Sequence, residues 1–191
     1  MFVRNWMTSP PVVVRSSTSA GEALRYLEKR QIRRLPVIED RRLVGIVTKS
    51  DLYAAFGKDG KSRQGQEQAI EKVMTKKPFT VAQEDTLERA ASLMLEKKVS
   101  GLPVVDGDRV IGIITESDVF RALCQIMGVG EQGARVIMSV KESEDLLAVV
   151  RKRLNGLTMR SLTTYHNPLL GHWEVVVRVR GRSRGEKTSP E

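Results

Sequence analysis

Apolar and polar positions follow the same order twice along the first two thirds of the chain. Short β-prone runs at 12–14 and 79–81 each follow a proline. Apolar residues at helical spacing come next, at 20–27 and 87–94. Two strand-like runs follow in each copy, LPVIE with LVGIVT and LPVVD with VIGIIT, and a Ser-Asp pair then opens another apolar stretch. The pattern therefore predicts two modules, each with the order β-α-β-β-α.

The two copies are an internal duplication with a spacing of 67 residues. Residues 7–56 align without a gap to residues 74–123, with 15 identities in 50 positions, where unrelated sequences of ordinary composition share about three. The clearest match is GIVTKSD at 45–51 against GIITESD at 112–118. A module of about 50 residues buries too little surface to be stable alone, so the two are expected to pack on one another.

The pattern also marks boundaries and helix starts. Ser19 with Glu22 forms a capping-box signal, and Asp85 with Glu88 is its counterpart. Residues 57–72 are polar with three glycines, which predicts a surface linker. We assign 1–60 to the first repeat, 61–127 to the second, 133–181 to a C-terminal module and 182–191 to a disordered tail.

The C-terminal module has its own β-α-β-β pattern. A strand is expected at 134–140, a helix at 146–154 closed by Gly156, and a hairpin around 166–172. In the last strand, Trp173, Val175, Val177 and Val179 fall on one face.

Composition narrows the class of protein. The chain of 191 residues is 40% apolar, has no apolar run long enough to span a membrane, and does not open with an apolar leader. With one cysteine it forms no internal disulfide, so a cytoplasmic protein is expected. The net charge of +9 is uneven: +5 over 1–60, −1 over 61–132 and +5 over 133–191. Any bound anion is therefore expected to be held unequally by the two repeats.

The repeated Gly-h-h-Thr-x-Ser-Asp motif, where h is apolar, describes a strand that ends at a helix start. Thr48 and Thr115 place a hydroxyl there, and Asp51 and Asp118 fall in the first helical turn. The free N–H groups of a helix start suit a phosphate, and a carboxylate suits the two hydroxyls of a ribose. A plainer interpretation stays open, in which the aspartates only cap their helices.

Three motifs recur in the same order in both copies: MTSPP and MTKKP, RRLPVIE and SGLPVVD, and the Gly-to-Asp ending. Together they resemble the CBS domain, named after cystathionine β-synthase. The resemblance implies an α+β fold in which the tandem repeats form an intertwined, pseudo-two-fold pair with two clefts for adenine nucleotides or S-adenosylmethionine.

The resemblance also implies roles for individual residues. Thr48 and Thr115 correspond to phosphate or ribose contacts, and Asp51 and Asp118 to ribose acceptors. Arg33 stands where AMP-binding members often place a basic phosphate ligand, whereas its counterpart Ser100 is uncharged. The adenine is expected near Val13 in one copy and Thr80 in the other. The full candidate set is Val13, Arg33, Thr48, Ser50, Asp51, Thr80, Ser100, Thr115, Ser117 and Asp118.

The C-terminal β-α-β-β pattern resembles the first part of an ACT domain, a ferredoxin-like module. Tandem CBS repeats followed by such a module are similar to the acetoin-utilisation accessory family. We do not expect the second helix and fourth strand of such a module here, and so expect an interaction or dimerisation role without an amino-acid site. His166 and His172 flank the hairpin loop without a third ligand, so no metal site is predicted.

The sequence thus predicts a non-catalytic regulatory protein, since no nucleophile with a base and no metal cluster emerges. It is expected to bind AMP, ADP, ATP or S-adenosylmethionine as a regulatory ligand and to signal through the geometry of a homodimer. No other cofactor is expected. Two alternatives remain: a nucleic-acid-binding regulator that uses the basic C-terminal module, and a dimerisation scaffold without a ligand.

Overall fold

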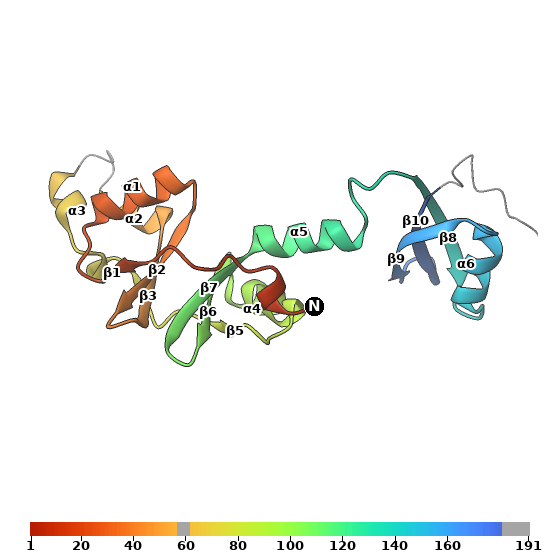
Figure 1. The fold of residues 1–191 in the computed structure, drawn as a ribbon, viewed down its shortest axis with the longest axis horizontal. Helices are drawn as coiled ribbons and strands as arrows, with labels where there is room; N and C mark the ends of the chain where they lie inside the picture. The colour runs from red at the N-terminus through yellow and green to blue at the C-terminus, as the bar shows by residue number, and fades with distance from the viewer. Residues whose placement is uncertain (57–61, 181–191) are drawn as a thin grey trace, which may run out of the picture. The chain divides into compact units, whose positions relative to one another are not determined.

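Both copies form the predicted β-α-β-β-α order (Figure 1). The computed structural model describes residues 1–56 and 62–180. The first copy consists of β1 (Val14–Arg15), α1 (Ala20–Arg30), β2 (Arg34–Glu39), β3 (Arg42–Thr48) and α2 (Lys49–Ala55). The second consists of β5 (Val81–Ala82), α4 (Leu87–Lys97), β6 (Gly101–Asp106), β7 (Arg109–Thr115) and α5 (Glu116–Ile126).

Two compact units make up the chain, Met1–Val119 and Phe120–Glu191. The first contains both copies up to the start of α5. The boundary predicted between the repeats, at 60 and 61, lies outside the described residues, and the division into repeats at that point stays a prediction.

Local signals explain where the first long helix of each copy begins and ends. The Ser19 hydroxyl accepts a hydrogen bond from the Glu22 N–H at 3.3 Å, as predicted. In the second copy the cap is Thr86, which accepts from Arg89 N–H at 3.1 Å, so the assignment of the cap to Asp85 was wrong. Asp85 lies one residue too early for the cap, and its carboxylate accepts from the Ala82 N–H at 2.8 Å instead.

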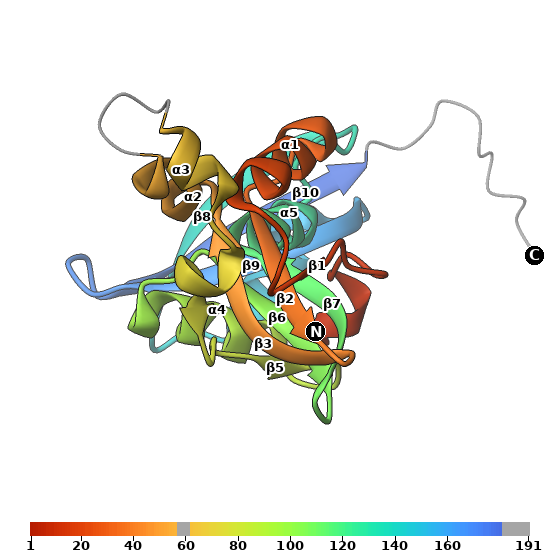
Figure 2. The ribbon, with the colours of Figure 1, turned by 90° about the vertical axis from the view of Figure 1, so that its left-hand side faces the viewer.

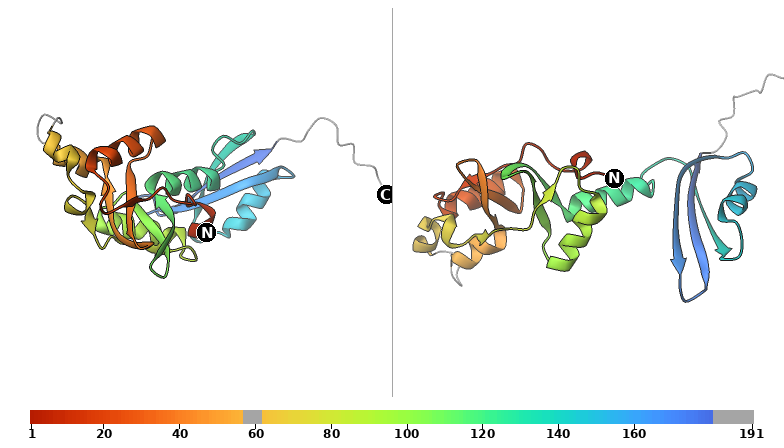
Figure 3. Two further views of the ribbon diagram at one scale, coloured as in Figure 1. Left: turned by 60° about the vertical axis from the view of Figure 1, so that its left-hand side comes forward. Right: turned by 90° about the horizontal axis from the view of Figure 1, so that it is seen from below.

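The sheet of the first unit has the strand order β1-β2-β3-β7-β6-β5. Figure 3 shows this unit from two further sides, with the first copy in red to orange and the second in yellow to green. Strands β2 and β3 form one antiparallel hairpin, and β6 and β7 form the other. The two hairpins meet where Arg42 pairs with Arg109. These two residues are counterparts at the 67-residue spacing, so the pseudo-two-fold axis of the pair passes between them.

The opening segment of each copy packs on the other copy. The Thr8 N–H donates to Ile113 O at 2.9 Å, next to Gly112 on β7. In the same way β4 (Thr75–Lys76) pairs with Gly45 and Ile46 of β3. The duplicated methionines explain the duplicated glycines: a Cβ on Gly112 would lie 2.7 Å from Met7 Sδ, and one on Gly45 would overlap Met74 Sδ. The intertwined arrangement is therefore built from residues common to both copies.

The segments around the short 3₁₀ helices η1 (Val3–Asn5) and η2 (Ile70–Lys72) also pack on the other copy. Phe2 forms an antiparallel bridge with Thr86, and its counterpart Ala69 forms one with Ser19. The N-terminus accordingly lies beside α4, where the Leu87 N–H donates to Met1 O at 2.8 Å (Figures 1 and 2). Both helices α1 and α4 are thus held at their starts by a segment of the other copy.

The predicted linker at 57–72 is only partly a linker. Residues 57–61 lie outside the described residues. The rest forms α3 (Arg63–Glu67) and η2, because the Ser62 hydroxyl caps α3 by accepting from Gly65 N–H at 3.1 Å. The structured part of this segment belongs to the packing of the first copy, since Ile70 is fully buried in its core.

Matching apolar positions form the core of the two copies. Leu27, Leu35, Val47 and Leu52 of the first copy are at most 1% exposed. In the second, Leu102, Val104 and Ile114 are fully buried. Burial of a large aliphatic side chain contributes about 1.5–3 kcal/mol. The repeated LPV and GII/GIV runs are therefore the inner faces of the two hairpins.

The second unit consists of β8 (Ala134–Lys141), α6 (Leu146–Leu154), β9 (Thr158–Asn167) and β10 (His172–Arg180). Its sheet order is β8-β10-β9, all antiparallel, so β8 and β9 flank β10 as in a split β-α-β unit. The predicted face of β10 is confirmed, because Val175, Val177 and Val179 are buried and Trp173 packs on them. The likeness to an ACT domain stays a prediction, and the predicted tail at 182–191 lies outside the described residues.

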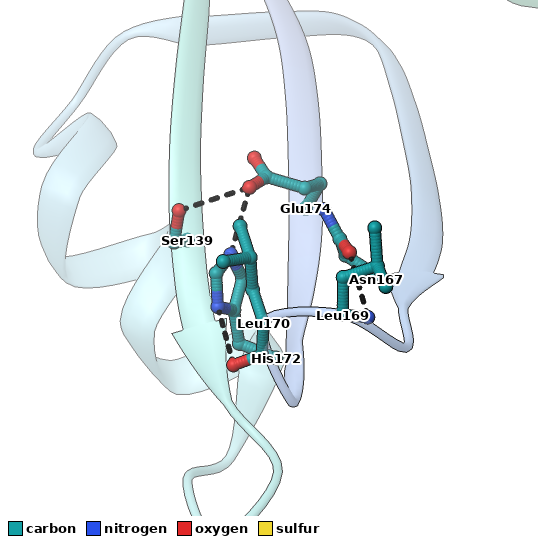
Figure 4. Close-up of polar contacts among 6 residues, drawn as sticks. All are labelled: Ser139, Asn167, Leu169, Leu170, His172 and Glu174. Carbon is teal, nitrogen blue, oxygen red and sulfur yellow. Dashed lines mark hydrogen bonds and ion pairs between the residues drawn. The ribbon is translucent and has the colours of Figure 1, made fainter.

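Both histidines of the second unit contact glutamates. His172 Nε2 lies 2.8 Å from Glu174 Oε1, which also accepts from the Ser139 hydroxyl (Figure 4). His166 Nε2 lies 2.6 Å from Glu142 Oε1. Across the described ranges, no cluster of three or more His, Cys, Asp or Glu side chains is arranged to hold a metal ion. Within the same ranges no helix is long and apolar enough to cross a membrane.

Candidate ligand-binding clefts

The first repeated Thr-x-Ser-Asp sequence forms a complete capping box at the junction of β3 and α2. The backbone N–H and the hydroxyl of Thr48 donate to Asp51 Oδ2 at 2.8 Å and 2.7 Å, and the Asp51 N–H donates to Thr48 Oγ1 at 3.3 Å. Among the described residues, none donates a hydrogen bond to the other carboxylate oxygen, Oδ1. Capping and ligand binding are thus compatible, since each uses a different oxygen of Asp51.

The second copy repeats this geometry at the junction of β7 and α5. The Thr115 N–H and hydroxyl donate to Asp118 Oδ2 at 2.9 Å and 2.6 Å. Asp118 is only 5% exposed, whereas Asp51 is half-buried. The carboxylate of the first copy is therefore the more accessible of the two.

Two hollows lie beside Thr48 within the first unit. One, of about 690 Å³, is lined mainly by polar and charged residues that include Glu28, Arg33, Lys49 and Ser50. The other, of about 250 Å³, is bounded by Asp51 and by apolar side chains that include Phe79, Val99 and Leu102. Arg34, Thr48 and Ser100 border both hollows. Lys77 and Lys98 also line the smaller hollow. Both hollows are therefore basic, and the smaller one has the larger share of apolar side chains.

The candidate residues from the sequence divide into three groups. Arg33, Thr48, Ser50 and Ser100 line the larger hollow, and Asp51 lines the smaller. Val13 and Thr80 are half-buried, one residue before β1 and β5, and line neither hollow, although Pro78 and Phe79 next to Thr80 line the smaller one. Thr115, Ser117 and Asp118 belong to the other helix start.

The opening segment of the second copy lines the hollow beside Asp51 of the first copy, which the alignment of the two copies did not suggest. Lys77, Pro78 and Phe79 follow β4, the strand that crosses to pair with β3. A cleft that contains Thr48 and Asp51 of the first copy is thus closed by the opening segment of the second. The exchange of opening segments, described above, produces this combination.

Arg34 is the basic residue that sequence reasoning missed. Its Nη2 donates to the Ser100 hydroxyl at 2.6 Å. Its Nη1 is shielded from solvent and has no hydrogen-bond partner among the described residues. Burial lowers the pKa of Arg34 below its ordinary value, and Arg33 adds to this; the carboxylates of Glu116 and Asp118 raise the pKa. A guanidinium nevertheless stays charged in proteins, so the cleft holds a partly unpaired cation.

Arg33, in contrast, is exposed and borders only the larger hollow. Its backbone carbonyl accepts from the Lys49 N–H at 2.9 Å, which fixes the start of α2 against β2.

The family model for the CBS domain matches residues 3–58 and 70–125, more than half of the chain. The protein belongs to the CBS-domain family. Both matched segments include the Met-Thr opening, the Leu-Pro-Val strand and the Thr-x-Ser-Asp helix start. The tandem CBS pair predicted from the sequence is therefore confirmed.

Solved structures of CBS pairs share the fold of this chain. CBSX2 in complex with AMP is 37% identical, and the match covers 65% of this chain and 97% of that chain with a TM-score of 0.58. The CBS pair of protein MJ0100, bound to 5′-methylthioadenosine and S-adenosylmethionine, is 31% identical, with coverage of 65% and 97% and a TM-score of 0.59. A putative acetoin utilization protein from Vibrio cholerae is 29% identical, with coverage of 69% and 98% and a TM-score of 0.59.

Curated relatives are mostly longer than the matched region. L-aspartate semialdehyde sulfurtransferase from Methanocaldococcus jannaschii is 33% identical over 122 residues, which are 63% of this chain and 23% of the relative. The chloroplastic protein CBSX2 from Arabidopsis thaliana is 35% identical over 140 residues, which are 60% of this chain and 59% of the relative. The chain thus spans less than two thirds of these relatives, and the shared part is the CBS pair.

Proposed function

We propose that this protein is a non-catalytic regulator that binds an adenosyl ligand in its CBS pair and signals through the geometry of a homodimer. The observation that carries the proposal is the pair of adjoining hollows at Thr48 and Asp51, both lined by basic residues and the smaller one also by apolar side chains. Similar CBS pairs bind AMP, 5′-methylthioadenosine and S-adenosylmethionine. An adenosine with a charged 5′ group matches this division of the site.

The chemistry of the lining supports one placement of the ligand. The ribose hydroxyls donate to Oδ1 of Asp51, the oxygen that the helix cap leaves available. The adenine lies in the smaller hollow against Phe79, Val99 and Leu102, where flat apolar surface is buried. A 5′-phosphate extends toward Thr48 and the basic residues of the larger hollow.

The homodimer is supported by aromatic side chains at matching positions. Tyr53 on α2 and its counterpart Phe120 on α5 are 44% and 67% exposed. Large apolar side chains at the surface are common at protein interfaces. A ligand that prefers one arrangement of such a dimer shifts the population toward it.

Isothermal titration calorimetry on nucleotide-free protein tests the proposal with AMP, ADP, ATP and S-adenosylmethionine. We expect at least one of them to bind. Asp51→Asn should weaken binding in the first cleft about tenfold, because the amide keeps the cap but loses the charged acceptor. Asp118→Asn is the matched control, since it makes the same change at the other helix start.

Sedimentation velocity on the same samples, with and without the bound nucleotide, measures the dimer and its change of shape. Absence of heat with all four ligands would contradict the binding proposal. A monomer at every concentration would contradict the dimer. The basic run at 178–187 is assigned no ligand, because most of it lies outside the described residues.

A further inference from the structure

The two edges of the sheet in the second unit differ in regularity. On the β9 edge, Arg178 pairs with Ser161 and Val179 with Met159, so Arg160 is left over as a bulge. A bulge of this kind interrupts an edge and hinders the addition of a further strand. On the other edge, β8 pairs with β10 through all eight of its residues without a shift, and it contains no proline. Among the described residues, no strand pairs with the outer side of β8.

The backbone of β8 shows which of its residues face this outer side. The Lys141 N–H donates to a carboxylate oxygen of Glu144 at 3.0 Å, and the Lys141 carbonyl accepts from the Glu144 N–H at 3.0 Å. Both backbone groups of Lys141 therefore point away from β10. In an antiparallel pair this direction alternates along the strand, so the N–H and C=O groups of Ser139, Ile137 and Arg135 also point outward.

The facing strand gives the same direction. Val179 pairs with Ala134, and its carbonyl oxygen lies toward β8, since a Cβ on Gly133 would overlap it. Ala134, and with it every second residue of β8, thus has its hydrogen bonds to β10. The intervening residues leave a regular row of donors and acceptors at the outer side.

The side chains of β8 are apolar at the middle of this edge. Ile137 is 59% exposed and lies opposite Val176 of β10 on the open face of the sheet. On the other face Met138 and Val140 are buried in the core that α6 covers. A regular edge strand with an exposed apolar residue at its centre is suited to pairing with another strand.

We propose that β8 pairs with β8 of a second copy of this chain, antiparallel and about a two-fold axis at Ile137, which joins the two sheets into one. Ile137 then lies opposite its own counterpart, and Arg135 lies opposite Ser139. These are the residues whose backbone groups point outward, so each opposed pair exchanges two hydrogen bonds. On the inner face Val136 meets Met138, which makes the two cores continuous. The inference rests on the proposed homodimer and adds a contact outside the CBS pair.

Charge decides against the neighbouring register. An axis at Met138 would place Arg135 opposite Lys141 of the second copy, and like charges directly opposite each other are destabilising. It would also need the Lys141 N–H, which already donates to Glu144. The axis at Ile137 avoids both conflicts.

The favoured register also brings opposite charges into one row. Glu174 pairs with Ser139 across β10 and β8, and the Ser139 hydroxyl donates to its carboxylate at 3.3 Å (Figure 4). Arg135 of the second copy continues this row on the far side of Ser139. Its guanidinium therefore faces an acidic row, as an interface with complementary charge requires.

Disulfide cross-linking of the full chain tests the contact. The sole cysteine is first removed by Cys124→Ser. Ile137→Cys should then form an intermolecular disulfide under mild oxidation, because opposed Cα atoms in a hydrogen-bonded antiparallel pair are about 5.5 Å apart, within the range of a disulfide. Thr163→Cys is the matched control, since Thr163 lies in the same row on β9. Non-reducing electrophoresis should show about tenfold more cross-linked dimer for Ile137→Cys than for the control.

Two further cysteine variants test the register. Arg135→Cys mixed with Ser139→Cys should cross-link, whereas Arg135→Cys alone should not, because the two copies of residue 135 are about 14 Å apart. Ile137→Lys, added to both members of the mixture, should reduce the cross-linked fraction about tenfold by placing like charges opposite each other. Thermal unfolding of each variant verifies that it is folded before oxidation.

The outcomes separate this contact from the proposed function. If Ile137→Cys cross-links no more than Thr163→Cys, the β8 contact is overturned, and nucleotide binding and dimerisation through the CBS pair stand. If Arg135→Cys alone cross-links as well as the mixture, the register about Ile137 is overturned. If Ile137→Cys cross-links but no adenosyl ligand gives heat, the β8 contact stands and the binding proposal fails.

Discussion

The two copies share their framework and differ at the centre of the pair. Thr48 with Asp51 and Thr115 with Asp118 have nearly the same hydrogen bonds, within 0.1 Å for the two that both copies show. Directly before the Leu-Pro-Val run, the first copy has Arg33 and Arg34, and the second has Ser100 and Gly101. Duplication thus preserved the groups that build a helix start and changed the charge beside it. The difference predicts that the two helix starts bind an anion with unequal affinity.

We expect the largest effect where the opening segment of each copy packs on a glycine of the other. Gly45→Val and Gly112→Val should each destabilise the protein by about 1–3 kcal/mol, because the added side chain enters the space of a methionine and a carbonyl of the other copy. The two costs should be similar, since both glycines face the same groups. Chemical denaturation with a fluorescence readout from Trp6 and Trp173 measures them.

A compensating substitution makes that comparison more specific. Met7→Ala should relieve part of the cost of Gly112→Val but none of the cost of Gly45→Val, because Met7 packs on the second copy. Relief of Gly45→Val by Met7→Ala would contradict the exchange of opening segments.

Sequence reasoning predicted the repeats and their elements well, because each depends on local patterns. The helices over 20–30 and 87–97 follow from apolar spacing and a cap, and the hairpins from alternation around polar turns. The local pattern alone could not predict which copy each opening segment packs on, whereas the resemblance to the CBS domain implied an intertwined pair. Met7 and Met74 are identical in type, so an exchanged pair and an unexchanged one bury the same side chains.

The candidate site was predicted in part for a similar reason. Thr48 and Asp51 were found because their spacing fits a helix start. Arg34 was not singled out beside Arg33 because its environment comes from Ser100 and Gly101, which are 66 and 67 residues away. The sequence does show an arginine and a glycine at equivalent positions of the two copies. That these two residues lie in contact is known only from the structure.

A smaller effect is expected at the two helix starts. Asp51→Ala should lower the free energy of unfolding by about 1 kcal/mol, the usual cost of a lost cap. Asp118→Ala should cost more, about 2 kcal/mol, because the Asp118 carboxylate is 5% exposed and its removal leaves the partly buried donors of Thr115 without this acceptor. Urea denaturation of both variants measures the difference. Equal costs would show that the burial of Asp118 adds nothing to the cap.

The smallest expected effect on stability is at Arg34. Burial disfavours the charged guanidinium, and Nη1 gains no hydrogen bond in return. Arg34→Gln keeps a donor for Ser100 and removes the charge, so the free energy of unfolding of ligand-free protein should stay the same or rise by up to about 1 kcal/mol. Urea denaturation measures this change beside Arg25→Ala, which removes an exposed arginine of the same copy. A loss of more than about 1 kcal/mol would mean that Arg34 holds the two copies together, whereas a gain would mean that the buried guanidinium lowers the stability of the ligand-free protein.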